Sequence, residues 1–259
     1  MKLPLVSRNN GYNPFVKEDS SMMMDVGLVK LTAGQIYEVN SATQESVFLL
    51  LEGQVEFAWD NQTVTAIRHD LFKEKPSVLH VCRGVAVIVT AIRDTELIQQ
   101  QASNLIAFDN RFYGPADSRV ETVWKDHFAG CAVRDVITTI DYSVNPLSKL
   151  VIGEVINHPG KWSSFIPHSH PQPEVYFYRF DAPQGFGAAF EEDDVYKSVD
   201  YSFSGIEGGK THPQVAAPGY AMYFCWMIRH FDGNPWTSRN DDPAHLWLIE
   251  KDAKIWPNK

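Results

Sequence analysis

The chain has 259 residues, of which 44% are hydrophobic and 21% are charged, a balance typical of a globular protein of one or two domains. Its formal charge of −9 disfavours a nucleic-acid-binding protein, because such proteins usually carry a basic patch. The three cysteines form no CxxC pair, and neither an apolar leader nor a run of roughly 18 apolar residues occurs, so we expect a cytoplasmic protein without disulfides or a membrane partner.

The first part of the chain alternates short apolar runs with turn residues, which is the pattern of β-strands. Glu52 and Gly53 are expected to form a turn inside the second of these runs, because glycine favours turns between strands. Residues 94–105 break the pattern and are expected to form a connection. The predicted strands here are 26–34, 46–60, 62–68, 77–81 and 84–93.

The second part of the chain repeats this rhythm. Gly, Pro and Asn separate most of its apolar runs, and many short strands with frequent turns are typical of a sandwich or a barrel. We therefore predict an all-β protein with two jelly-roll-like β-barrel domains, residues 1–105 and 106–259. The predicted strands in this part are 134–141, 149–157, 174–180, 186–192, 195–201, 220–229 and 245–250.

A candidate metal site starts at His168 and His170, whose spacing places both side chains on one face of a strand. Glu174 has the same parity, and His212 follows a glycine-rich turn. Imidazole and carboxylate are good ligands for Zn, Mn, Fe or Ni. An isolated HxH pair is more often two ordinary loop histidines, but the strand pattern and the later histidine favour a metal site.

Three stretches of the second part resemble the 5-deoxy-glucuronate isomerase family of myo-inositol catabolism, which has a bicupin fold. They are GEVINHPGKWSSFIPHSH at 153–170, EVYFYRFDAPQGFG at 174–187 and THPQVAAPGYAMYF at 211–224. The resemblance is close over most of residues 130–228, whereas the first part, which has no HxH pair, shows only a fold-level likeness to a cupin without metal. The resemblance implies one divalent metal per chain, Zn or Mn ahead of Fe or Ni, held by His168, His170, Glu174 and His212.

The chain departs from that family's pattern at three places. Only residues 171–173 separate the HxH pair from the carboxylate, where the family has a longer insertion. Residues 208–211 replace the Pro-x-Gly that often precedes the last histidine, and neither Cys225 nor Trp226 supplies the asparagine often found in the closing strand. These departures are compatible with a divergent branch that acts on a related substrate.

The resemblance implies an aldose–ketose isomerisation of a sugar acid, 5-deoxy-glucuronate to 5-dehydro-2-deoxygluconate. A proton then moves between adjacent carbons while a metal stabilises the enediolate. Side chains on the strand face of Glu174 and a lysine in another strand of the motif-rich half are catalytic candidates. Other cations or polar groups are candidates for the substrate carboxylate, although core packing or a solvated charge explains each of them as well. The catalytic candidates are Tyr176, Tyr178 and Lys197, and the substrate-binding candidates are Arg179, Gln184 and Lys210.

Three other functions stay open. An isomerase of a 4-deoxy-5-keto uronate would use the same site, and an Fe(II) cupin dioxygenase would use the same ligand types. A non-catalytic sugar-binding cupin is the third, while the absence of a basic stripe argues against a DNA-binding regulator. In each case the expected partner is a small sugar acid, and the unpaired edges of the sheets favour a homo-oligomer.

Overall fold

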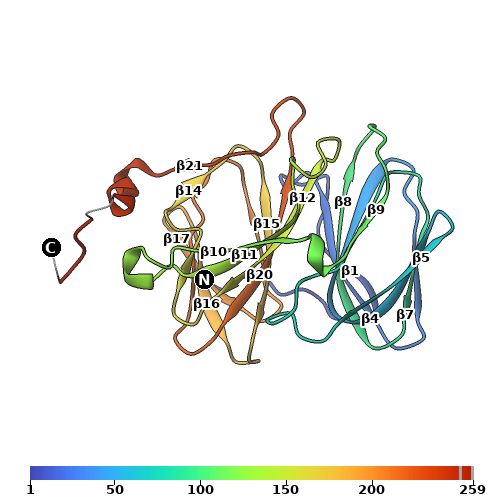
Figure 1. Cartoon of the computed structure of the whole chain (residues 1–259), viewed down its shortest axis with the longest axis horizontal. Helices are drawn as coiled ribbons and strands as arrows, with labels where there is room; N and C mark the ends of the chain where they lie inside the picture. Colours follow the sequence, from blue (N-terminus) through green and yellow to red (C-terminus); the bar gives the residue numbers. More distant parts are fainter. Residues whose placement is uncertain (251–252, 258–259) are drawn as a thin grey trace.

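The computed structural model describes residues 1–250 and 253–257, and nearly all of their regular structure is β-strand. Figure 1 shows two barrels side by side, the first built from the blue to green part of the chain and the second from the green to red part. The predicted all-β, two-barrel fold is confirmed. Within the described residues, the structure contains no helix with the length and apolar character needed to span a membrane.

The first barrel consists of one nine-stranded antiparallel sheet. Its main path runs β1-β2-β8-β4-β6-β9, while β5 and β7 pair with β4 and β3 pairs with β7. The strands are β1 (Gly11–Val16), β2 (Asp25–Leu31), β3 (Ile36–Val39), β4 (Gln44–Trp59), β5 (Gln62–Arg68), β6 (Val78–Val81), β7 (Val87–Ala91), β8 (Thr95–Ser103) and β9 (Arg111–Tyr113).

Strand β4 continues through the position where a turn was predicted. Its first part pairs with β8 and β6, its second part pairs with β5 and β7, and the register shifts between Leu50 and Glu52. Gly53 has φ of +112°, and a Cβ there would lie 2.4 Å from the backbone oxygen of Asp94. The predicted turn is therefore wrong, because these residues form a bend that carries one strand between two groups of partners.

Residues 94–105 contain a central strand, so the predicted connection is also wrong. Strand β8 pairs with β2 and β4, and most of its side chains are buried. Its glutamines are hydrogen-bonded: the Tyr37 hydroxyl donates to Gln99 at 2.7 Å, Gln99 donates to Gln101 at 2.6 Å, and Gln101 donates to Ser46 at 2.8 Å. This chain of bonds lets a polar-looking segment lie inside a sheet, since buried amides need partners.

The second barrel combines a six-stranded sheet, β10-β11-β12-β20-β15-β18, with a four-stranded sheet, β13-β19-β16-β17, and the small pair β14-β21. Its strands are β10 (Arg119–Val123), β11 (Arg134–Ile140), β12 (Leu150–Asn157), β13 (Trp162–Ser163), β14 (His168–Ser169), β15 (Glu174–Phe180), β16 (Phe186–Glu191), β17 (Asp194–Val199), β18 (Phe203–Ile206), β19 (Gln214–Ala216), β20 (Met222–Arg229) and β21 (Asn240–Asp241).

Short 3-10 helices complete the second half of the chain, and one of them replaces a predicted strand. They are η1 (Pro115–Asp117), η2 (Phe128–Gly130) and η3 (Pro243–Ile249). The strand expected at 245–250 is wrong because Pro243 starts a helical turn and the Asp242 carboxylate accepts a hydrogen bond from the Ala244 N–H.

The core has three parts, and the alternation of β15 shows how they meet. One cluster fills the first barrel, another lies inside the second, and the largest contains residues of both barrels and joins them. Val175 and Phe177 belong to the shared cluster, whereas Tyr176 and Tyr178 belong to the cluster inside the second barrel. Glu174 has the parity of these tyrosines, so its strand directs it into the second barrel.

A buried ion pair crosses the boundary between the barrels. The Arg68 guanidinium donates to both carboxylate oxygens of Glu154, at 2.7 and 3.0 Å, and the Tyr223 hydroxyl donates to the same carboxylate at 2.6 Å. The side chains of Arg68 and Glu154 are fully buried. The other guanidinium N–H groups donate to backbone carbonyls of the first barrel, so the pair is completely hydrogen-bonded.

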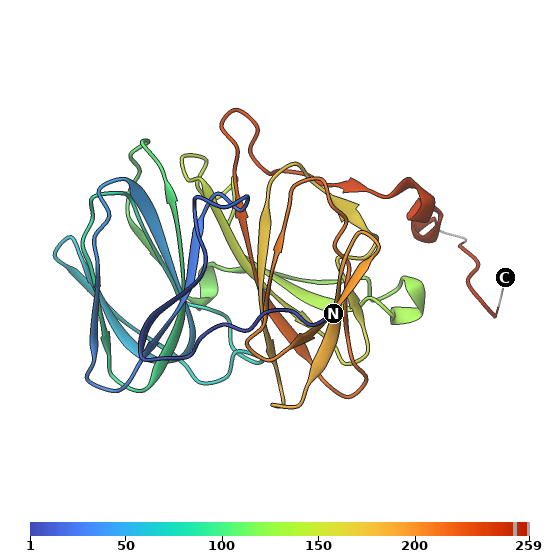
Figure 2. The ribbon, with the colours of Figure 1, turned by 180° about the vertical axis from the view of Figure 1, so that it is seen from behind.

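The division of the chain between the two barrels is not a single boundary at residue 105. Residues 1–6 lie along the second barrel, where the Leu3 N–H donates to the Lys197 carbonyl and the Val6 N–H donates to the Tyr201 carbonyl. Figures 1 and 2 both show the N-terminus at that barrel. At the other end, β9 pairs with β6, so the first sheet extends past the predicted division.

Candidate metal centre

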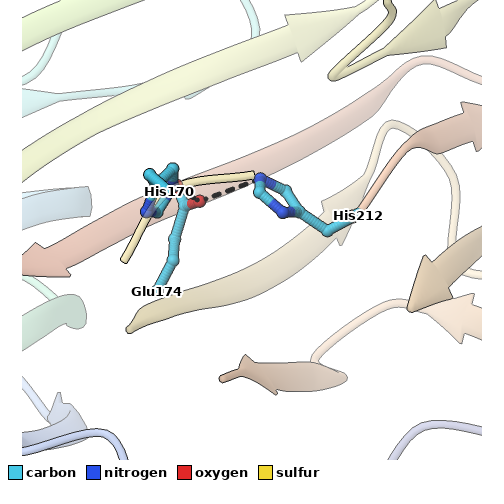
Figure 3. Close-up of side chains that lie close together, drawn as sticks. All are labelled: His170, Glu174 and His212. Atoms are coloured by element: carbon cyan, nitrogen blue, oxygen red, sulfur yellow. Dashed lines mark hydrogen bonds and ion pairs between the residues drawn. The ribbon is translucent and has the colours of Figure 1, made fainter. Parts of the chain in front are cut away.

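Three of the four predicted metal ligands meet inside the second barrel. Possible ligand atoms of His170, Glu174 and His212 all lie within 4.8 Å of one another, and all three side chains are buried (Figure 3). The Nε2 atoms of both imidazoles are 3.2 Å from Oε2 of Glu174. His168 lies beside this group, with its ring centroid 4.9 Å from that of His212.

Backbone carbonyls orient all three imidazoles in the same way. Nδ1 of His168 lies 2.9 Å from the Ile166 oxygen, Nδ1 of His170 lies 2.9 Å from the Gln172 oxygen, and Nδ1 of His212 lies 3.0 Å from the Lys210 oxygen. A carbonyl can only accept, so each Nδ1 carries the hydrogen and each neutral ring keeps its lone pair on Nε2. This arrangement is typical of metal-ligating histidines.

The electrostatics of the group favour a cation between its members. Burial would raise the pKa of Glu174, but the neighbouring His170 and His212 outweigh it and hold that pKa at about 2. Burial would likewise lower the pKa of His212, but the Glu174 carboxylate raises it. Within the described part of the chain, Nε2 of His212 has no partner other than the Glu174 carboxylate. An ionised carboxylate and two Nε2 lone pairs facing one point fit a divalent cation.

The position of His168 differs from that of the other two histidines. Burial, together with the nearby His212, lowers the pKa of His168 to about 3, so its imidazole is neutral at physiological pH. Strand β14, on which it lies, pairs with β21 and with no other strand among the described residues. A neutral imidazole beside the three-residue group is available as a fourth ligand.

The short link between the HxH pair and Glu174 contributes directly to the site. Pro171 and Pro173 restrict the backbone on either side of Gln172, because the proline ring fixes φ. The Gln172 carbonyl orients His170, and its side-chain amide donates to the Asn234 carbonyl at 2.7 Å. The absence of a longer insertion is therefore compatible with an intact ligand group.

A glycine contact joins the two ligand-bearing loops. A Cβ on Gly208 would lie 1.8 Å from the Pro171 carbonyl oxygen, so only glycine permits this approach. The next residue, Gly209, donates its N–H to the His170 carbonyl at 2.7 Å. The glycine-rich turn before His212 thus brings the His212 loop against the loop that carries His170.

Replacing Gly208 by alanine is expected to lower the metal affinity about 10- to 100-fold, the range seen when groups that orient metal ligands are lost. The added methyl group must displace one loop, because the Pro171 oxygen occupies its position. Competition with a chelator of known affinity measures the effect. Gly114→Ala is the matched control, since the nearest atom to its Cβ would be 3.7 Å away and its φ is −78°. Equal affinities of the two variants would contradict this account of the contact.

A hollow of about 140 Å³ opens beside the ligand group. Tyr176 lines it and lies with its hydroxyl 3.3 Å from that of Ser164. Burial and the nearby Glu174 carboxylate raise the pKa of Tyr176 well above its ordinary value, so its phenol stays protonated. The hollow therefore offers a neutral hydroxyl next to the candidate metal position.

The structure places the other two catalytic candidates outside this hollow. Tyr178 lies inside the barrel, but its hydroxyl donates to Gln214 at 2.8 Å and lies 3.0 Å from the Ser204 hydroxyl. Lys197 is exposed on β17, with Nζ 4.6 Å from the centre of the Phe186 ring. The polar groups of both residues contact other side chains, and neither residue lies beside the ligand group.

The three predicted substrate-binding residues are likewise elsewhere. Strand alternation turns Arg179 out of the barrel, where it pairs with Glu96 at 3.3 Å and Asp200 at 2.9 Å. Gln184 is exposed in the turn before β16. Lys210 pairs with Glu191 at 2.7 Å. None of the three is among the described residues that line the hollow.

Two arginines that the sequence interpretation missed line the hollow, Arg134 and Arg239. Arg134 starts β11 and shares its parity with Val136, which also lines the hollow, so strand alternation could have identified it. Arg239 lies in the segment before β21, where no periodic pattern marks it. Only the folded chain brings it beside His168.

Similar proteins are known at the level of sequence and of fold. A sequence model of the KduI/IolB family matches residues 6–248. The 5-deoxy-glucuronate isomerase of Geobacillus thermodenitrificans is 27% identical over 243 residues, which cover 85% of this chain and 84% of that protein. An IolB-like protein from Salmonella typhimurium superposes with a TM-score of 0.88 at 19% identity, covering 96% of this chain and 100% of that one. Oxalate decarboxylase from Lactobacillus farciminis has a TM-score of 0.64 at 11% identity, with 91% and 85% covered. The two structures establish a bicupin fold.

Proposed function

The chain belongs to the KduI/IolB family, and from this membership we propose that it is a metal-dependent aldose–ketose isomerase of a sugar acid. The proposed reaction converts 5-deoxy-glucuronate to 5-dehydro-2-deoxygluconate in myo-inositol catabolism, since relatives that align with most of the chain are 5-deoxy-glucuronate isomerases. The observation that carries the proposal is the buried group of His170, Glu174 and His212, whose imidazoles present Nε2 to one point.

Aldose–ketose isomerisation requires stabilisation of negative charge on two neighbouring oxygens while a proton moves between adjacent carbons. When bound, a divalent cation would supply Lewis-acid stabilisation of that charge. His170, Glu174 and His212 would hold the cation, and His168 is the adjacent candidate for a fourth ligand. The carbonyl partners of the three Nδ1 atoms keep the imidazoles in the ligating tautomer.

Tyr176 is the proposed proton-holding group at the reacting end of the substrate. Its hydroxyl lines the hollow and stays protonated, so it can donate a hydrogen bond to a sugar oxygen that gains negative charge. Tyr178 packs at a ring-centroid distance of 6.1 Å from Tyr176. Because the Tyr178 hydroxyl is bound to Gln214, we assign it the role of fixing the position of Tyr176.

Removal of metal is expected to abolish conversion of 5-deoxy-glucuronate, and one equivalent of Zn or Mn is expected to restore it. The physical reason is that Glu174 and the imidazoles hold the cation, whereas no other described group of His, Cys, Asp or Glu offers three ligand atoms so close together. The measurement is elemental analysis of the isolated protein, followed by chelation, metal addition and NMR of the sugar under anaerobic conditions.

The same assay separates the competing functions. If turnover requires dioxygen, the protein is a dioxygenase and not an isomerase. If it binds the sugar without turnover, it is a sugar-binding protein. A 4-deoxy-5-keto uronate is tested side by side, and a large preference for it would change the substrate but retain the reaction type. Full activity in the chelated protein would refute metal dependence.

A further inference from the structure

Arg134 is a buried cation without an ion-pair partner in the described structure. Its side chain lines the hollow beside the ligand group, and the residue is only 5% exposed. Its one side-chain hydrogen bond among the described residues goes from Nη1 to the Ala132 carbonyl at 3.1 Å. A guanidinium has five N–H donors, so most of its hydrogen-bonding capacity is left for a ligand.

The fully buried Arg68 and the partly buried Arg179 are paired with carboxylates, whereas the buried Arg229 has no ion pair among the described residues. Arg68 donates to both oxygens of Glu154, and Arg179 pairs with Glu96 and Asp200. An unpaired buried charge is costly, because the interior does not replace its hydration. Arg134, unlike Arg229, lines the hollow beside the ligand group, so a molecule that enters the hollow can supply its missing partner.

Arg239 places a second guanidinium at the same hollow. It forms an ion pair through Nε with Asp241 at 2.8 Å, which leaves its terminal nitrogens for another acceptor. Burial and the field of Arg239 lower the pKa of Arg134 to about 10, so the two charges lie close enough to repel each other. An anion between them would satisfy both, whereas Glu174 is committed to His170 and His212.

We propose that Arg134 and Arg239 bind the carboxylate of the sugar acid and thereby select anionic over neutral sugars. This assignment rests on the proposed function of the adjacent site. The ligand group then holds the reacting end of the substrate and the two arginines hold its acidic end. Planar guanidinium groups suit this task, because they bind carboxylates through two parallel hydrogen bonds.

The test compares D-glucuronate with D-glucuronamide, two sugars that differ only in the carboxylate. Calorimetric titration of the metal-loaded protein is expected to show about 10- to 100-fold tighter binding of glucuronate, the range for charge-assisted hydrogen bonds. Arg134→Gln is expected to remove most of this preference while glucuronamide affinity stays within about twofold. Arg239→Gln is expected to act in the same direction by a smaller factor, because Asp241 already shares its charge.

Arg119→Gln is the matched control. Arg119 lies on the neighbouring strand β10, is exposed and pairs with Asp141, so its loss is expected to leave the preference unchanged. Metal content and near-ultraviolet circular dichroism verify the fold of each variant. If Arg134→Gln does not fold, the more exposed Arg239→Gln carries the test.

The outcomes separate this inference from the proposed function. Equal loss of affinity for both sugars, an unchanged preference in folded arginine variants, or no preference in the unmodified protein would overturn the carboxylate site. If the unmodified protein prefers glucuronate but does not isomerise 5-deoxy-glucuronate, the isomerase proposal fails and the anion site stands. If the unmodified protein isomerises 5-deoxy-glucuronate but the folded arginine variants keep the preference for glucuronate, the carboxylate site fails and the isomerase proposal stands.

Discussion

The double variant His170→Ala, His212→Ala is expected to bind no stoichiometric metal and to lose isomerase activity by about a thousandfold or more, since Lewis-acid stabilisation supplies several kcal/mol. Both Nε2 atoms that face Glu174 are removed, which leaves one member of the closest ligand group. Elemental analysis of the purified variant and NMR of the sugar measure the two losses. Retention of one metal per chain together with activity would refute the assigned centre.

Two further variants separate loss of metal from loss of fold. Removing both imidazoles leaves the Glu174 carboxylate buried without the two histidines that pair with it, which destabilises the chain by itself. Adding Glu174→Gln removes that charge, so the triple variant is expected to fold better and still bind no metal. His158→Ala is the histidine control, because His158 pairs with Asp135 and lies outside the hollow. It is expected to retain metal and activity.

Replacing Arg68 by methionine is expected to lower the free energy of unfolding by about 3–5 kcal/mol, the usual cost of leaving one member of a buried ion pair without its partner. Glu154 would keep only the Tyr223 hydroxyl among the side chains that now donate to it. The pair joins the two barrels, so the loss is expected throughout the molecule. Urea unfolding followed by circular dichroism and tryptophan fluorescence measures it.

The double variant Arg68→Met, Glu154→Leu is expected to recover most of this loss, because it removes both charges from the interior. Lys73→Ala is the surface control: its pair with Asp70 is largely exposed, and its removal is expected to leave the free energy of unfolding nearly unchanged. If Arg68→Met changed the free energy of unfolding as little as Lys73→Ala does, the buried pair would contribute little to holding the barrels together.

Local periodicity was sufficient for the fold class and for the face of β15 that carries Glu174 and Tyr176. Alternation along one strand is a local property, and residues 174–180 pair with β20 without a register shift. Local periodicity did not predict β8, because the glutamines of that strand can be buried only when they are hydrogen-bonded to side chains on other strands, such as Tyr37 and Ser46. A polar run cannot reveal from its own sequence that its amides will be paired.

Residues that meet only through tertiary contacts could not be predicted from the sequence for the same reason. Gly208 reads as an ordinary turn glycine, and only the approach of the Pro171 carbonyl explains why no side chain fits there. The predicted cations Lys197 and Lys210 lie near the motifs in the sequence, whereas Arg239 lines the hollow from a segment far along the chain. Proximity in sequence is a poor guide to which charge faces a barrel interior.

The attachment of residues 1–6 to the second barrel has a consequence for the order of biosynthesis. The Met1 amino group donates to the Val195 carbonyl, 194 residues further along the chain. At about 5–20 residues per second, a ribosome needs roughly 10–40 s to add that stretch. Leu3 and Val6 therefore remain without their hydrogen-bond partners while all strands of the first barrel are being made. Docking of this segment is a late step, and it can occur only after β17 of the second barrel has been synthesised.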